Sequence, residues 1–128
     1  ARSDMILDQP DATDLLAIAR TMLREEVAPG LSGDARFKVL MVANAMAMAI
    51  RESEHGAALD AEALADLRSM YDEPEGTAEV LSHRLAQDIR AGHFDADAPA
   101  ANLHRLLLAD SRRRLAIGNP RYLAESDI

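Results

Sequence analysis

The stretch that most constrains the fold of this chain runs from Phe37 to Glu54 and reads FKVLMVANAMAMAIRESE. Between Val39 and Ile50 the only polar residue is Asn44, and the run contains neither Gly nor Pro. Ala, Leu and Met are strong helix formers, so the composition predicts a helix. Apolar residues lie all round its axis, which is typical of a helix enclosed by others. The run is shorter than the roughly 20 residues of a transmembrane span, so we expect the central buried helix of an all-α domain.

Further helices are expected on both sides of this stretch. The first carries Leu15, Leu16, Ala19, Met22, Leu23 and Val27 at helical spacing, begins after Asp8 or Asp11, and stops at Pro29-Gly30. The central helix should end near His55-Gly56. Later helices are expected over 60–71, over 77–91 with Thr77 as its cap, and over 100–117 with Gly118 as its stop. The prediction is an all-α, single-domain bundle of about five helices over residues 5–123, with 1–4 and 124–128 as flexible termini.

Composition and charge limit the partners. A chain of 128 residues and 13.9 kDa is long enough for one domain with its own core. A net charge of -8 and a pI near 4.9 disfavour nucleic acid and anionic membranes as partners. The chain has no cysteine and opens with no recognisable leader, which is compatible with a cytoplasmic protein.

One stripe of the central helix contains the main candidate binding residues. At about 100° per residue, the side chains that share this stripe are Phe37, Met41, Asn44, Met48, Arg51 and His55. In one interpretation the stripe lines a pocket, with Asn44 and Arg51 as polar anchors and Met48 as adaptable lining. In the other, which we favour, Asn44 is a buried amide bonded to main chain and only specifies packing.

Other polar clusters have simpler explanations than chemistry. The four histidines form no i, i+4 pair and no HExxH motif. His93, Asp95 and Asp97 could bind a divalent ion, but a helix-capping role of Asp97 is a simpler explanation of this segment. Arg112 to Arg114 suit the negative end of a helix dipole better than an anion clamp, because successive side chains diverge by about 100°. We therefore expect no catalytic residue, no metal ligand and no cofactor.

Three segments, in this order and spacing, carry a resemblance to a known family: NAMAMAIRE (Asn44–Glu52), IRAGHFD (Ile89–Asp95) and LAIGNPRYL (Leu115–Leu123). With the opening DQPDATDLL (Asp8–Leu16), the chain resembles a small all-helical bacterial domain family of unknown function. Members of such families are encoded beside, or fused to, aminoglycoside-phosphotransferase-like kinases, often near acyl-CoA dehydrogenases. The resemblance implies an accessory role beside such a kinase and assigns no catalytic residue.

The sequence leaves several functions open. The first is a non-catalytic interaction domain that docks on a phosphotransferase-like kinase, in a setting of acyl-CoA metabolism, or forms a homo-oligomer. Arg121 and Tyr122 are residue types that are enriched at binding hot spots, so we expect them to contact a partner. The alternative is a helical bundle that binds an acyl or CoA-like molecule. An enzyme whose site is completed by another chain is a third.

Overall fold

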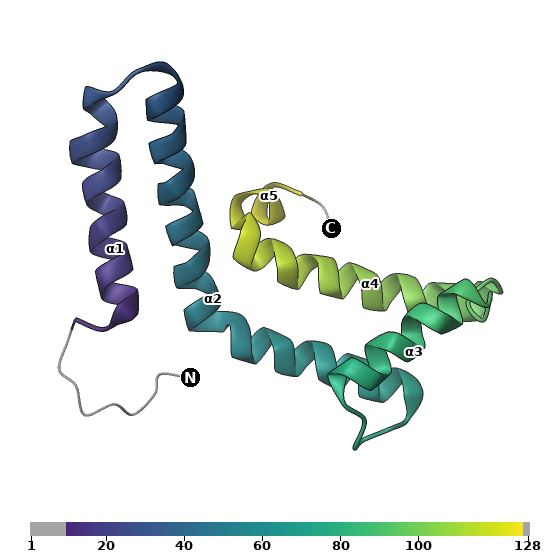
Figure 1. Cartoon of the computed structure of the whole chain (residues 1–128). Helices are drawn as coiled ribbons and strands as arrows, with labels where there is room; N and C mark the ends of the chain where they lie inside the picture. The colour runs from purple at the N-terminus through teal and green to yellow at the C-terminus, as the bar shows by residue number, and fades with distance from the viewer. Residues whose placement is uncertain (1–9, 127–128) are drawn as a thin grey trace. The chain divides into compact units, whose positions relative to one another are not determined.

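The computed structural model describes residues 10–126, and this part of the chain contains helices and loops but no strand (Figure 1). The α-helices are α1 (Ala12–Met22), α2 (Gly33–Tyr71), α3 (Ala78–Arg90), α4 (Asp97–Gly118) and α5 (Pro120–Glu125). The predicted all-α class with about five helices, one of them central, is confirmed. Expectations for residues 1–9 and 127–128 lie outside the described residues. No helix within 10–126 has the length and hydropathy of a membrane span.

The chain divides into two compact units, Ala1–Ala57 and Ala58–Ile128. We call them the first and the second unit. Within the first unit, α1 and the beginning of α2 form an antiparallel helical hairpin (Figure 1). Within the second unit, the last turns of α2 lie beside α4, and α3, which lies between them in the sequence, is adjacent to both.

Local signals set the beginning of α1 and α3 as the sequence predicts. The Asp11 side chain accepts a hydrogen bond from the Asp14 backbone N–H at 2.9 Å, and the Asp14 side chain accepts one from the Asp11 backbone N–H at 3.1 Å. This capping box satisfies amides that the first helical turn leaves unpaired. Thr77 Oγ1 likewise accepts from Val80 N at 3.3 Å at the beginning of α3. Between α1 and α2 the chain passes through a π-type turn (Leu23–Val27) and a 3₁₀ turn (Ala28–Gly30).

The expected end of the central helix near His55-Gly56 is wrong, because α2 runs unbroken from Gly33 to Tyr71. A glycine inside a helix costs only about 1 kcal/mol relative to alanine. The residues that follow Gly56 are mainly Ala, Leu and Glu, which favour helix and outweigh that cost. Asp60, the expected start of the helix over 60–71, therefore lies within α2.

The C-terminal helices also differ from expectation. Asp97 is the first residue of α4 and does not cap it; the cap position is Ala96, which has no side-chain acceptor. A carboxylate in the first turn still faces the positive end of the helix dipole. After Gly118, Asn119 Oδ1 accepts from Tyr122 N at 3.1 Å and begins α5. The boundary expected after Leu123 falls inside this helix.

The central stretch is not enclosed as its all-round apolar character predicts. In α2 before residue 51 only Ala43 and Ala47 are buried, whereas Phe37 and Met41 are 62% and 56% exposed. Within the first unit α2 has one helical neighbour, α1, and the two meet through small side chains. Larger apolar side chains of the stretch therefore face away from that contact.

The continuity of α2 predicts that Gly56→Ala stabilises the protein by about 0.5–1 kcal/mol, because alanine loses less backbone entropy in a helix. A Cβ at position 56 would meet only Glu52 Cγ, at 3.4 Å. Chemical denaturation monitored by helical circular dichroism measures the change. Gly92→Ala is the contrasting variant: φ is +80° there and a Cβ would lie 2.8 Å from Asp95 Oδ2, so it should destabilise. A loss of stability in Gly56→Ala would contradict an unbroken helix.

Candidate functional site

The hairpin of the first unit is held by an alanine face and by a few polar contacts. Ala43 is 1% exposed and Ala47 is also buried, both on the side of α2 that meets α1. Arg20 Nε of α1 donates to the Ala43 carbonyl at 3.2 Å, and Thr13 Oγ1 lies 3.4 Å from Ser53 Oγ. Small side chains let two helix backbones approach closely, so this contact uses little of the apolar volume of α2.

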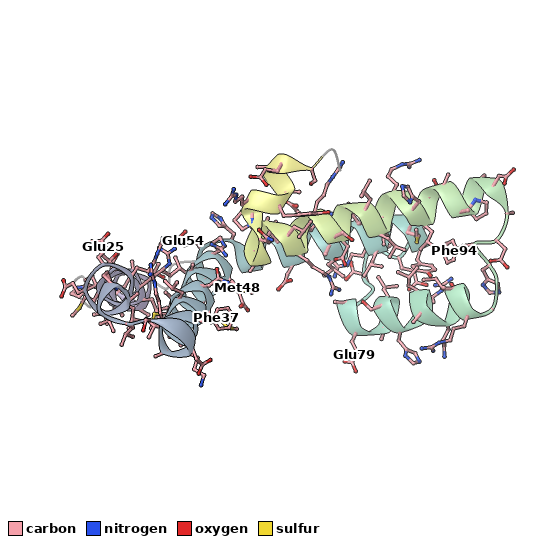
Figure 2. All side chains as sticks on the ribbon, turned by 90° about the horizontal axis from the view of Figure 1, so that it is seen from above. Glu25, Phe37, Met48, Glu54, Glu79 and Phe94 are labelled. Atoms are coloured by element: carbon pink, nitrogen blue, oxygen red, sulfur yellow. The ribbon has the colours of Figure 1, made fainter. Side chains whose placement is uncertain are left out.

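Four of the exposed apolar side chains of α2, together with one amide, form a stripe along one side of the helix. The α2 stripe comprises Phe37, Leu40, Met41, Asn44 and Met48, all exposed. The spacing of three, four and seven residues brings them to one side of the helix. In Figure 2 the labelled Phe37 and Met48 lie on α2 away from α1. Contiguous apolar surface of this kind marks interaction sites in soluble proteins.

A second apolar stripe lies on α1. The α1 stripe consists of Leu15, Ile18 and Met22, each exposed over half of its surface or more. Their spacing of three and four residues again places them on one face of the helix. Together the two stripes leave most of the large apolar side chains of the hairpin in contact with solvent.

The structure separates the binding residues that the sequence predicts. Asn44 and Met48 lie on the α2 stripe, and Arg51 lies half-buried one turn further along α2. Asn44 is exposed, so the interpretation of a buried amide that specifies packing is wrong. Arg121 and Tyr122 lie on α5 in the second unit, and both are exposed; Arg121 Nε donates to Glu125 Oε1 at 2.9 Å. A binding role for these five residues stays a prediction.

The second unit has a small core and two grooves. Leu81 of α3 is fully buried and Leu67 of α2 is 9% exposed. The first groove, of about 560 Å³, is lined by Asp66, Ser69, Met70, Asn102, Arg105, Leu106, Ala109 and Arg113. The second, of about 640 Å³, lies between α2, α3 and α4 and includes Leu64, Leu85 and Leu107. Both grooves are lined by residues of this unit alone.

One ion-pair cluster borders both grooves. The Arg113 guanidinium of α4 contacts the Asp66 carboxylate and lies 3.5 Å from Glu62 Oε2, both on α2. The hydrogen bond that Arg113 donates to Asp66 is the main reason that the pKa of Arg113 is raised above its ordinary value. Because Arg113 is largely covered, the cluster fastens α4 to α2. Its neighbour Arg114 pairs with Asp110 at 2.9 Å, at the four-residue spacing of a helix-surface ion pair.

A second polar cluster joins the end of α2 to α3 and to the loop that follows α3. Tyr71 Oη donates to Asp88 Oδ2 at 2.8 Å, and His93 Nδ1 lies 3.0 Å from Asp88 Oδ1. Arg84 Cζ lies 4.2 Å from the centre of the Tyr71 ring, and Arg84 Nη1 donates to Glu73 Oε1 at 2.6 Å. None of these residues lines either groove, so the geometry favours a structural role over a general-base pair. We call this cluster, which links the end of α2 to α3 and the following loop, the clasp.

Sequence reasoning missed both polar clusters. Arg113 and Asp66 are 47 residues apart, and no local pattern links a basic residue to an acidic one at that distance. Tyr71 and Asp88 are 17 residues apart and meet only because the intervening loop reverses the chain. No group of three or more His, Asp or Glu side chains suited to a metal ion occurs within residues 10–126.

The described fold is thus an all-helical domain with two grooves in one unit and uncovered apolar stripes in the other. A protein-family model described as a domain of unknown function (DUF6285) matches residues 29–122. The chain therefore belongs to this family. The match begins after α1 and spans α2, α3 and α4. Searches of curated proteins and of solved structures give no match.

The clasp predicts a pH dependence. Burial, and then the hydrogen bond and charge of Asp88, raise the pKa of Tyr71 from 10.0 to about 12. A raised pKa stabilises the fold below pH 10, where the phenol is protonated in both states, and the contribution is lost as the pH rises from 10 to about 12.

The measurement is an ultraviolet titration of Tyr122→Phe, which leaves Tyr71 as the only tyrosine. Tyrosinate absorbance should appear with a midpoint near pH 12. In the same background, Asp88→Asn should lower that midpoint because it removes the carboxylate charge. A Tyr71 midpoint near pH 10 in the folded protein would contradict the clasp.

Proposed function

We propose that this domain is a non-catalytic interaction module whose first unit binds another protein through the apolar side chains of α1 and α2. The observation that carries the proposal is the burial pattern of the hairpin. Its buried side chains are the alanines Ala28, Ala43 and Ala47, whereas several of its large apolar side chains are exposed over half of their surface or more: Leu15, Ile18, Met22, Phe37 and Met41. Exposed apolar patches rimmed by polar residues are typical of protein-binding surfaces.

The polar groups of the second unit support the same proposal. The Arg113 and Tyr71 clusters join helices to each other or to a loop, which is what a rigid scaffold requires. Tyr122 and Arg121 lie exposed on α5, where a partner has access to them. Tyr and Arg contribute strongly to interfaces because each combines a large contact area with polar groups.

The partner that we propose is a phosphotransferase-like kinase, in a setting of acyl-CoA metabolism. This part of the proposal rests on the family resemblance carried by Asn44–Glu52, Ile89–Asp95 and Leu115–Leu123. The net charge of -8 adds a physical expectation: the surface of the partner that meets this domain should be neutral or basic.

The test is binding of the purified domain to a purified phosphotransferase-like kinase of the kind that the resemblance implies, measured by calorimetry. The double variant Leu15→Gln/Ile18→Gln should weaken binding at least tenfold, because glutamine keeps the helix but removes apolar contact. Ala17→Gln, on another face of α1, is the matched control and should bind as the native chain does. Arg121→Ala/Tyr122→Ala should also weaken binding. Native affinity in both double variants would overturn the proposed surface.

A small-molecule function is the second candidate, and the first groove of the second unit favours it. Met70, Leu106 and Ala109 supply apolar lining, while Asn102 and Arg105 supply polar groups. Arg113 is already engaged by carboxylates, whereas no carboxylate within residues 10–126 pairs with Arg105. An acyl chain that ends in a carboxylate or phosphate would match this combination.

Thermal denaturation in the presence of decanoate or decanoyl-CoA tests this candidate. Binding to the native state should raise Tm in proportion to the logarithm of ligand concentration. Arg105→Gln should abolish most of the rise, and Arg112→Gln, on the same helix outside the groove, should preserve it. An unchanged Tm of the native chain at millimolar ligand would exclude such a site.

A further inference from the structure

We infer that the α2 stripe binds a second copy of this chain, with the two α2 helices antiparallel across a two-fold axis near Asn44. The inference rests on the proposed function, since it assigns one of the two apolar stripes to self-association and leaves the α1 stripe to a different partner. Four observations carry it: the placement of the two methionines of the stripe, the position of its one amide, the charges at its ends and its area.

Two methionines of the stripe flank Asn44 at similar distances along the helix. Met41 lies three residues before Asn44 and Met48 four residues after it. A two-fold axis perpendicular to two antiparallel helices brings residues before the axis opposite residues after it. Met41 of one copy then meets Met48 of the second copy, and each such contact occurs twice, as a symmetric interface requires.

Asn44 is the polar residue at the centre of this apolar surface, and it is exposed in the single chain. A carboxamide carries both donors and acceptors, so two copies of the same side chain can bond to each other. At a two-fold axis Asn44 meets Asn44 of the second copy, and the pair satisfies itself. A buried Asn pair of this kind fixes register and orientation between helices at some cost in stability.

Charges at the two ends of the stripe favour the antiparallel arrangement. The N-terminal end carries Asp34, Arg36 and Lys38, a formal charge of -1 +1 +1 = +1, and the C-terminal end carries Arg51, Glu52 and Glu54, a formal charge of +1 -1 -1 = -1. Antiparallel helices bring the N-terminal end of one copy to the oppositely charged C-terminal end of the other. A parallel pair would instead set ends of the same net charge together, which is less favourable.

The α1 stripe lacks this complementarity. Asp11 precedes it, and Glu25 and Glu26 follow it, so both of its ends are acidic. Two antiparallel copies paired through α1 would bring carboxylates together. Self-association is therefore assigned to α2 and not to α1.

The exposed area is sufficient for a stable dimer. From the exposed fractions of Phe37, Leu40, Met41 and Met48, each copy offers roughly 350–400 Å² of apolar side chain. Two copies bury roughly 750 Å² of apolar surface, which at the ordinary apolar share corresponds to a total interface of about 1,300 Å². Specific dimers bury about 1,200–2,000 Å² in total, so the stripe reaches that range.

Sedimentation equilibrium of the full chain tests the inference. The native chain should be a dimer at micromolar concentration. Met41→Glu should raise the dimer dissociation constant at least 100-fold, because it places a carboxylate in the apolar contact. Leu15→Glu is the matched control: the native residue is as exposed, on α1, and the variant should remain a dimer. Circular dichroism verifies that both variants are folded.

Engineered cysteines test the register. The chain has no cysteine of its own, so each introduced thiol is unique. Asn44→Cys should form an intermolecular disulfide under mild oxidation, because residues at a two-fold axis approach within the 4.4–6.8 Å between Cα atoms that a disulfide spans. Leu15→Cys, equally exposed on α1, should stay a free thiol under the same conditions.

Three results would overturn the inference. They are a native chain that is monomeric at every concentration, a dimer that Leu15→Glu dissociates and Met41→Glu does not, and cross-linking through Leu15→Cys and not through Asn44→Cys. Calorimetry with the kinase keeps the two proposals distinguishable. A chain that is monomeric but binds the kinase through α1 would refute only the dimer. A chain that forms the dimer but does not bind the kinase would refute only the proposed function.

Discussion

The close approach of α1 and α2 through alanines is the constraint on which the rest of the first unit depends. Ala43 and Ala47 allow the two backbones to come near enough for Arg20 to bond a main-chain carbonyl of the opposite helix. The large apolar side chains of α2 are only partly used in this contact: Val39, Met46 and Ile50 are half-buried, whereas Phe37, Met41 and Met48 are exposed.

This arrangement explains why the first unit should not function alone. Two helices that bury only alanines gain little from removing apolar surface from water, and most helix stability in proteins comes from packing an apolar face. The second unit differs, because Leu81 and Leu67 give it a small core and the Arg113 and Tyr71 clusters fasten its elements. The proposed dimer contact through the α2 stripe would supply stabilisation that the hairpin lacks and would link oligomerisation to its folding.

Local rules predicted the fold well where a local interaction decides it. The caps at Asp11 and Thr77 follow from side-chain and backbone chemistry within a few residues. The break expected at Gly56 failed because helix-forming neighbours outweigh one glycine. The buried centre expected for residues 39–50 failed for a different reason. A helix that is apolar on all sides is expected to be covered by other residues, but the sequence does not show whether those residues belong to the same chain or to another. The pairing of Arg113 with Asp66 depends on tertiary contact alone, and no local pattern contains it.

The most direct measurement of the central claim is an isotope-filtered NMR experiment on a mixed sample, in which half of the chains are uniformly ¹³C-labelled and half are unlabelled. The filtered spectrum then reports only contacts between different copies. The account predicts intermolecular nuclear Overhauser effects to the Met41 and Met48 methyl groups from protons of the second copy's α2. A filtered spectrum without effects at these two methyl groups, from a sample whose unfiltered spectrum shows their contacts within one chain, would contradict it.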